Sequence, residues 1–203
     1  MKCFLIVGLG NPEGRYFNTW HHLGFKAAEE TAANFVLMQK SPFKKRGNQL
    51  LAEAKVGDSR VFILKPLTYM NLSGQAVLAV ARKYKIPAEN IIVFADDVYI
   101  DIGHIRITTG GGSGGHNGIQ SISELLKSAN YIKIRIGAKP AKDIKGNTAD
   151  YVLSKIPDEL LPQVTESLNL AAAAATEIIT DGGIDAVKGK YNSKNTVGNT
   201  VGK

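Results

Sequence analysis

The feature that most constrains the fold is a pair of short apolar runs with no polar residue inside them. Residues 3–8 and residues 91–95 each have the length of one β-strand. A strand that faces water on one side alternates polar and apolar residues, whereas a strand buried on both faces does not. The two runs are therefore typical of central strands in a parallel sheet that helices cover on both sides.

Candidate helices and further strands alternate along the rest of the chain. The spacing of apolar residues predicts helices over 22–39, 73–84, 119–128 and 157–180. Strand patterns cover 49–56, 60–65, 102–108 and 131–136, and the break at Gly57-Asp58-Ser59 predicts a hairpin between the first two. This order predicts a single α/β domain with a twisted mixed, mostly parallel sheet and helices on both faces.

Length and composition set the limits of this domain. The chain has 203 residues, of which 44% are hydrophobic, and this is enough for one sizeable core. From Lys188 onward the sequence is polar and basic and contains glycine. We therefore expect a domain over residues 1–187 and a flexible tail over residues 188–203.

The charge balance favours a polyanionic partner. The chain carries 25 Lys and Arg residues against 18 Asp and Glu residues, a net charge of +7, which favours nucleic acid over a membrane surface. Cys3 is the only cysteine, which excludes a disulfide within the chain. No apolar stretch approaches the ~20 residues that span a bilayer. We expect a cytoplasmic protein that does not associate with membranes.

Three glycine-containing segments carry the unusual polar residues of the chain. They are residues 8–22, 66–74 and 95–118. Asn11 and Asp96 follow the carboxyl ends of predicted buried strands, where open α/β sheets place their sites. Asn117 stands near the start of a predicted helix, so it is either a site residue or the N-cap of that helix.

The glycine loops do not match nucleotide-binding motifs. Glu13 stands where the third glycine of the dinucleotide fingerprint would follow Gly8 and Gly10. The loop from Gly110 to Gly118 has no Lys-Ser or Lys-Thr after it, so it is not a phosphate loop. Close approach of the backbone to a ligand, or a turn, explains these glycines better.

The four histidines favour hydrolysis by an activated water over metal chemistry. His104 lies in a predicted strand, and its expected role is structural. His21 and His22 are adjacent, so their side chains diverge, and neither has the usual ligand spacing to a metal shared with His116 and Asp96. A neutral histidine, an aspartate that orients it and amide donors suit a general base, its partner and an oxyanion site. We predict no metal and no cofactor.

Four motifs resemble the bacterial peptidyl-tRNA hydrolase family, in the same order and with the same spacing. They are Val7-Gly8-Leu9-Gly10-Asn11-Pro12, Thr19-Trp20-His21-His22-x-Gly24-Phe25, Pro66-x-Thr68-Tyr69-Met70-Asn71-x-Ser73-Gly74 and Gly110-Gly111-Gly112-x-Gly114-Gly115-His116-Asn117-Gly118. The resemblance extends from Cys3 to about Gly183. It implies a compact monomeric α/β enzyme, without metal or cofactor, that cleaves the ester between a peptide and the terminal ribose of tRNA.

The resemblance also implies roles for individual residues. The family's catalytic histidine corresponds to His21 and its partner aspartate to Asp96. The family's asparagines that bind the peptide or stabilise the oxyanion correspond to Asn11, Asn71 and Asn117. Further substrate contacts are implied for Tyr16, Tyr69, Met70 and His116.

The family binds the tRNA 5′-phosphate with an arginine and a lysine. The arginine corresponds to Arg135, but Thr108 stands at the lysine position. Because Arg106 lies two residues earlier on the same predicted face, we expect Arg106, Arg135 and Lys133 to share this contact. The alternative is an ordinary solvated face of the sheet.

Several residues depart from the family pattern. Trp20 and His22 flank His21 in place of an arginine and an asparagine, Tyr99 replaces an acidic residue, and Ser113 replaces a histidine. These departures leave open an RNA-binding paralogue on the same scaffold with little catalysis. A small-ester or nucleotide hydrolase is disfavoured by the positive charge and by the missing phosphate-loop lysine.

Overall fold

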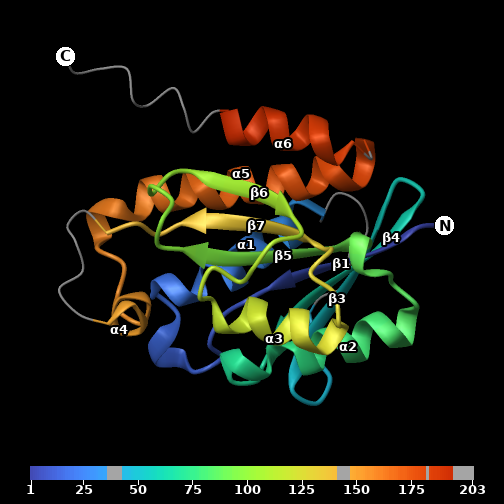
Figure 1. The fold of residues 1–203 in the computed structure, drawn as a ribbon, viewed down its shortest axis with the longest axis horizontal. Helices are drawn as coiled ribbons and strands as arrows, with labels where there is room; N and C mark the ends of the chain where they lie inside the picture. Colours follow the sequence, from blue (N-terminus) through green and yellow to red (C-terminus); the bar gives the residue numbers. More distant parts are fainter. Residues whose placement is uncertain (36–42, 141–146, 182, 194–203) are drawn as a thin grey trace.

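A seven-stranded sheet forms the frame of the molecule. The computed structural model describes residues 1–35, 43–140, 147–181 and 183–193. The strands pair in the order β2-β3-β4-β1-β5-β7-β6 (Figure 1). Their bounds are β1 (Cys3–Gly8), β2 (Lys44–Lys45), β3 (Gln49–Val56), β4 (Ser59–Pro66), β5 (Ile91–Asp97), β6 (Ile105–Thr109) and β7 (Ile132–Gly137). The four central strands β4, β1, β5 and β7 are parallel, and the outer pairings are antiparallel, which confirms the predicted mixed sheet.

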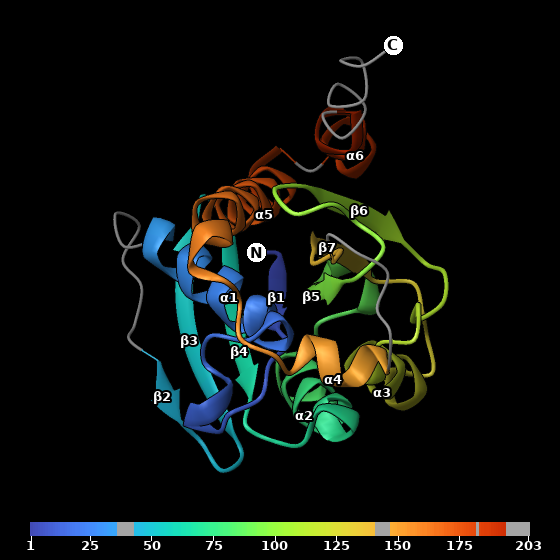
Figure 2. The same ribbon diagram turned by 90° about the vertical axis from the view of Figure 1, so that its left-hand side faces the viewer.

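Helices cover both faces of this sheet. Their bounds are α1 (Leu23–Asn34), α2 (Ser73–Tyr84), α3 (Asn117–Leu126), α4 (Thr148–Val152), α5 (Leu161–Asp181) and α6 (Ile184–Ser193). α1 and α5 pack on one face, and α2 and α3 pack on the other (Figure 2). Among the described residues, no helix is both long and apolar enough to cross a membrane.

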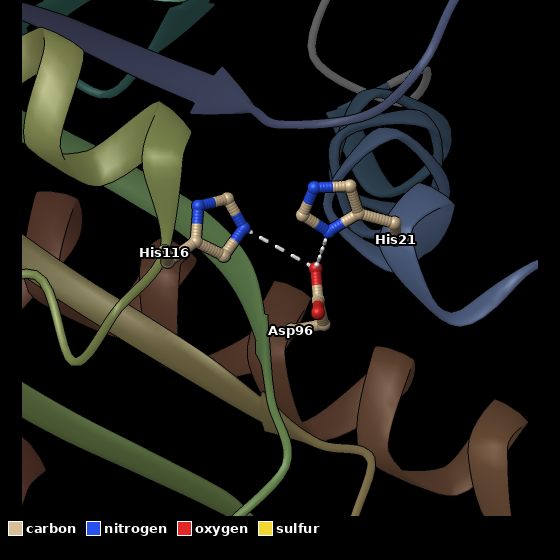
Figure 3. A group of neighbouring side chains, drawn as sticks. All are labelled: His21, Asp96 and His116. Atoms are coloured by element: carbon tan, nitrogen blue, oxygen red, sulfur yellow. Dashed lines mark hydrogen bonds and ion pairs between the residues drawn. The ribbon is translucent and has the colours of Figure 1, made fainter. Parts of the chain in front are cut away.

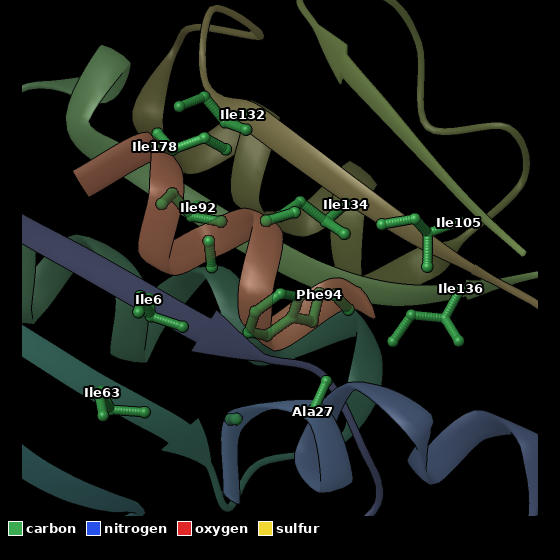
Figure 4. Packing of buried hydrophobic residues seen from close by; sticks show 14 of the residues in the cluster. Ile6, Ala27, Ile63, Ile92, Phe94, Ile105, Ile132, Ile134, Ile136 and Ile178 are labelled. Atoms are coloured by element: carbon green, nitrogen blue, oxygen red, sulfur yellow. The ribbon is translucent and has the colours of Figure 1, made fainter. Parts of the chain in front are cut away.

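The central strands divide their side chains between two hydrophobic cores. In β5, Ile92 and Phe94 face α1 and α5, whereas Ile91 and Val93 face α2 and α3. Figure 4 shows the first core, in which Ile134 of β7 lies on the same face as these two residues. Because both faces are covered, every position of the strand needs an apolar side chain. This explains the uninterrupted apolar runs of the sequence.

Some elements differ from the predicted bounds. The helix expected over 22–39 begins at Leu23, after a 3₁₀ turn over Trp20–His22, and ends at Asn34; residues 36–39 lie outside the described part of the chain. The strand expected over 102–108 begins only at Ile105. β2 and α4 were not predicted, because two and five residues are too few to carry a hydrophobic period.

The prediction of a flexible tail from Lys188 onward is wrong for residues 188–193, and residues 194–203 lie outside the described part of the chain. The helix α6 continues to Ser193, and it buries Val187 and Tyr191 against the core. The Tyr191 hydroxyl donates to Glu177 Oε1 at 2.7 Å, and the Asn192 side chain exchanges two hydrogen bonds with the backbone of Ile107 in β6, at 2.8 and 2.9 Å. Through Asn192, α6 thus bonds backbone groups of β6, the last strand of the sheet. The polar composition of α6 does not reveal this role.

Candidate active site

The site lies where β1 and β5 end and α1 begins. A Cβ atom on Gly24 would lie 2.4 Å from the carbonyl oxygens of Leu9 and Phe94, so only glycine lets the first turn of α1 contact both strand ends. The Phe25 N–H donates to Leu9 O at 3.0 Å and fixes this contact. His21, in the 3₁₀ turn just before α1, is thereby held over the end of β5, where Asp96 is located.

His21 and Asp96 form a close hydrogen-bonded pair. The distance from His21 Nδ1 to Asp96 Oδ1 is 2.8 Å, and the side chains are 12% and 5% exposed (Figure 3). Burial alone raises the pKa of Asp96. The adjacent charge of His21 and the hydrogen bonds from His116 and His21 outweigh burial and hold this pKa below its ordinary value. An ionised Asp96 accepts the Nδ1 proton of His21, which leaves the Nε2 lone pair of His21 available as a base.

His116 contributes a second hydrogen bond to the same carboxylate oxygen. Its Nε2 lies 3.2 Å from Asp96 Oδ1 (Figure 3). Its Nδ1 accepts the N–H groups of Gly118 and Ile119 at 3.1 and 3.4 Å, so His116 is the N-cap of α3. Since Nδ1 accepts, the proton of the neutral ring is on Nε2 and points to Asp96.

Sequence reasoning missed this contact. It left the N-cap of this helix open for Asn117, and the resemblance implied only a substrate contact for His116. In the structure Asn117 is the first residue of α3 and is exposed. The position of His116 directly before a helix was the available signal. Histidine is not a favoured N-cap residue, so the pattern alone does not suggest it.

The tautomer of His116 disfavours a metal at this site. His21, Asp96 and His116 offer ligand atoms within 4.8 Å of one another. A metal ligand must present a lone pair, but His116 uses Nδ1 for two backbone N–H groups and carries its proton on Nε2. Ligation would require loss of the Nε2 proton from a neutral ring. The absence of a metal cofactor stays a prediction, with this argument in its favour.

A cavity of about 380 Å³ opens in front of the pair. Of the residues implied by the resemblance, it is lined by Asn11, His21, Met70, Asp96, His116, Asn117 and Arg135. Tyr69 instead lines a second cavity of about 440 Å³, and Asn11 borders both cavities. Asn71 is exposed and lies in the 3₁₀ turn over Met70–Leu72. Neither Asn71 nor Tyr16 is among the lining residues of the first cavity.

One part of the cavity wall comes from a segment that the sequence did not suggest. This part is lined by Asn147, Thr148, Ala149, Val152 and Leu153, from α4 and its two ends. The Asn147 side chain accepts the N–H of Ala149 at 3.0 Å and caps this helix. An Asn before a short helical stretch is the only local signal, and it indicates a cap, not a site.

The two predicted phosphate arginines stand side by side. Arg106 of β6 pairs directly with Arg135 of β7, so both side chains are on the same face of the sheet. Arg135 donates to Asp97 Oδ2 at 3.1 Å and to Gly112 O at 3.0 Å, which fixes its guanidinium beside the glycine loop. Arg106 is exposed.

Arg135 is itself buried, at 9% exposure. Lys133 is covered more completely and does not join Arg106 at the surface, contrary to our expectation. It is 1% exposed, and its ammonium donates to Gly110 O at 2.8 Å and to Ala129 O at 3.0 Å. Burial is the main cause that lowers its pKa to about 8, with a smaller effect from Arg135. Lys133 therefore ties the glycine loop to the sheet and cannot reach a phosphate. The alternation of residues along the strand predicts the face of the sheet on which Lys133 lies. It does not predict that the glycine loop covers that face.

The residues that depart from the family pattern have local partners. His22 Nδ1 donates to Asn11 O at 3.1 Å, and burial lowers the pKa of His22 to about 4. The Trp20 ring is buried and stacks on Tyr151 of α4. Ser113 Oγ accepts the N–H of Gly115 at 3.3 Å within the glycine loop. The divergence predicted for His21 and His22 is confirmed, since one contacts Asp96 and the other the Asn11 segment.

Comparison with known sequences gives one consistent family. The family model described as peptidyl-tRNA hydrolase matches residues 5–198. The chain is 39% identical over 188 residues to the peptidyl-tRNA hydrolase of Alkaliphilus oremlandii, covering 93% of this chain and 98% of that one. It is 40% identical over 190 residues to that of Clostridium acetobutylicum, with 93% and 97% covered.

Solved structures agree with these sequence matches. A peptidyl-tRNA hydrolase from Acinetobacter baumannii superposes with a TM-score of 0.83 at 30% identity, covering 94% of each chain. A peptidyl-tRNA hydrolase in complex with N-propanol gives a TM-score of 0.84 at 29% identity, again over 94% of each chain. A methylthioadenosine nucleosidase from Arabidopsis thaliana shares only the fold, with a TM-score of 0.55 at 11% identity.

Proposed function

This chain belongs to the peptidyl-tRNA hydrolase family, and on this premise we propose that it is an enzyme that hydrolyses the ester bond between a peptide and tRNA. Such an activity returns tRNA from stalled or aborted translation for reuse. The observation that carries the proposal is the hydrogen bond between His21 Nδ1 and buried Asp96, beside a cavity lined by amide side chains. The arrangement provides a base, its orienting carboxylate and candidate oxyanion donors.

His21 is the general base of the proposed reaction. Its Nε2 takes a proton from a water molecule, and the water oxygen attacks the ester carbonyl carbon. Asp96 holds the ring in the tautomer that exposes Nε2 and stabilises the imidazolium that forms. When the tetrahedral intermediate breaks down, the bond from carbon to the ribose oxygen cleaves, and the Nε2 proton passes to that oxygen. His116 orients Asp96 through its hydrogen bond to Oδ1.

Asparagine side chains are proposed to handle the substrate carbonyls. We propose that Asn117, which lines the cavity, and Asn71, in the 3₁₀ turn over Met70–Leu72, stabilise the developing oxyanion or hold the water. Asn11 and Asn71 would bond the peptide main chain, which explains tolerance of many peptide sequences. Tyr16, Tyr69, Met70 and His116 complete the proposed substrate contacts.

Binding of the tRNA is proposed to rest on charge. Arg135 and Arg106 share one face of the sheet next to the glycine loop, and the chain carries a net charge of +7. We propose that these two arginines bind the 5′-phosphate of the tRNA, without Lys133. Affinity would then fall as salt concentration rises. We further propose that the enzyme acts in the cytoplasm as a monomer, without metal or cofactor.

The direct test is release of free tRNA from purified peptidyl-tRNA. We expect turnover by the natural chain and a loss of about 10²–10⁴-fold in kcat for His21→Ala. His104→Ala is the matched control, because His104 is not among the lining residues of the cavity and its side chain bonds the backbone oxygen of Ile102 at 3.3 Å. A natural chain that binds tRNA but releases none would favour the RNA-binding paralogue instead.

A further inference from the structure

Part of the cavity wall is a helix too short to hold itself in place. α4 has five residues, and a helix of this length has no stability of its own in water. Yet α4 and its two ends supply five residues to the lining of the cavity. The position of this wall must therefore come from contacts with the rest of the molecule.

Three such contacts join the α4 segment to residues just before His21. The rings of Trp20 and Tyr151 stack with centroids 5.7 Å apart and an angle of 22° between their planes. Thr19 forms an isolated antiparallel bridge with Lys155. The Ile156 N–H donates to Asn18 O at 2.8 Å. The wall and the proposed base are thus parts of one connected unit, as the proximity of α4 to the segment before α1 in Figure 2 also indicates.

The Trp20 ring is the fixed member of this unit. Its side chain is 1% exposed and belongs to the core shared with Val152 and Ile156, which follow Tyr151 in the chain. Tyr151 is only partly buried and packs against that core. The two backbone contacts involve residues 155 and 156, beyond the end of α4. The helix itself is held by side chains: Val152 is buried in the core, and Tyr151 stacks on Trp20.

We propose that the Trp20–Tyr151 stack sets the distance between α4 and His21, and that Tyr151 is a positioning residue for substrate binding. The inference rests on the proposed hydrolase function and names a determinant of its substrate affinity. Tyr151 does not line the cavity, so it acts through the neighbouring wall residues Ala149 and Val152. With the stack intact, the cleft is preformed and the substrate does not bear the cost of ordering its wall.

Trp20 is the only tryptophan of the chain, so emission excited beyond the tyrosine absorption reports on the surroundings of this one ring. In Tyr151→Ala we expect the Trp20 emission to shift to longer wavelength and acrylamide to quench it more strongly. We expect KM for peptidyl-tRNA to rise about three- to tenfold, the range of an aromatic pair, with kcat within about twofold. Tyr151→Phe keeps the ring and should restore both readouts.

Tyr99→Ala is the matched control, since it removes an exposed tyrosine that contacts neither Trp20 nor the cavity. An unchanged emission in Tyr151→Ala would show that the stack does not form. A shifted emission with an unchanged KM, or an equal loss in kcat, would overturn the positioning role. If the natural chain itself shows no turnover, the proposed function fails, and fluorescence without substrate still decides whether the stack exists.

Discussion

Two adjacent aspartates at the end of β5 have opposite surroundings. Asp96 accepts hydrogen bonds from His21 and His116 on Oδ1, whereas Asp97 accepts from Arg135 on Oδ2 and from the Tyr99 N–H on Oδ1. Successive residues of a strand face opposite sides of the sheet, so one strand end serves two separate groups. One aspartate orients the proposed base, and the other holds the proposed phosphate-binding arginine.

The two aspartates have the same side chain, so their different roles come from the elements that pack on each face of the sheet. The 3₁₀ turn before α1 brings His21 to the side of Asp96, whereas β7 brings Arg135 to the side of Asp97. If this division is real, changes on the two sides should affect different kinetic constants. Changes near Asp96 should lower kcat, and changes near Asp97 should raise KM.

The largest effect is expected for Asp96→Asn. The amide that replaces the carboxylate can donate to His21 Nδ1, and the ring then holds its proton on Nε2 and loses the lone pair that the reaction needs. Loss of an orienting carboxylate of this kind costs about 10³–10⁴-fold in kcat. Steady-state release of tRNA gives this value. Asp97→Asn is the paired control and should change KM while kcat stays within about twofold. A similar fall of kcat in both variants would contradict the separate roles of the two aspartates.

A smaller effect is expected for Arg135→Gln. Removing the guanidinium takes away a charged donor beside the glycine loop, and the neutral amide avoids placing a second carboxylate next to Asp97. We expect KM to rise about tenfold, the usual cost of a charge-assisted hydrogen bond, with little change in kcat. Arg82→Gln, an exposed arginine in the last turn of α2, controls for loss of one positive charge. An equal rise of KM in both variants would mean that Arg135 acts only through net charge.

Acid should destabilise the fold through His22, which is buried next to His21 and contacts the Asn11 segment. Its pKa falls from 6.5 in the unfolded chain to about 4 in the folded one through burial. Between these values the unfolded chain binds more protons, so the free energy of unfolding decreases as the pH falls. We expect His22→Asn, which keeps a donor for Asn11 O, to lose about 1–2 kcal/mol less than the natural chain between pH 7.5 and pH 5.

Urea unfolding at the two pH values measures this difference. His104→Asn removes a histidine from the turn before β6 and is the matched control. Equal losses of stability in the natural chain and in His22→Asn would contradict the burial of a neutral His22. Such a result would also mean that burial of a neutral imidazole does not explain how the fold accommodates His22 in place of the family's asparagine.

The sequence predicted the fold better than the site, for physical reasons. Uninterrupted apolar runs mark β1 and β5 because burial on both faces acts on every residue of a strand. The resemblance supplied the His21–Asp96 pair, whose members are 75 residues apart. No local pattern reveals that His116 shares Asp96 Oδ1 or that Lys133 is covered by a loop. Those contacts depend on how segments meet in three dimensions.

The same limit explains α4 and α6. A helix of five residues has no hydrophobic period to detect. The helix α6 buries Val187 and Tyr191 and bonds the edge strand β6 through Asn192, so it has no long apolar stripe. Both helices are held by side chains whose partners lie far away in the sequence. Composition therefore indicates a tail where the molecule has a helix.

The smallest effect, and the sharpest test of the proposed phosphate face, is expected for Arg106→Gln. Arg106 pairs with Arg135 across β6 and β7 but is exposed, so it needs no internal partner and its loss leaves the site geometry intact. We expect KM to rise about two- to threefold at low salt, and the slope of log KM against log salt concentration to decrease by about one. A change in KM without a change in slope would mean that Arg106 contacts no phosphate. The Asp97 side would then bind tRNA through Arg135 alone.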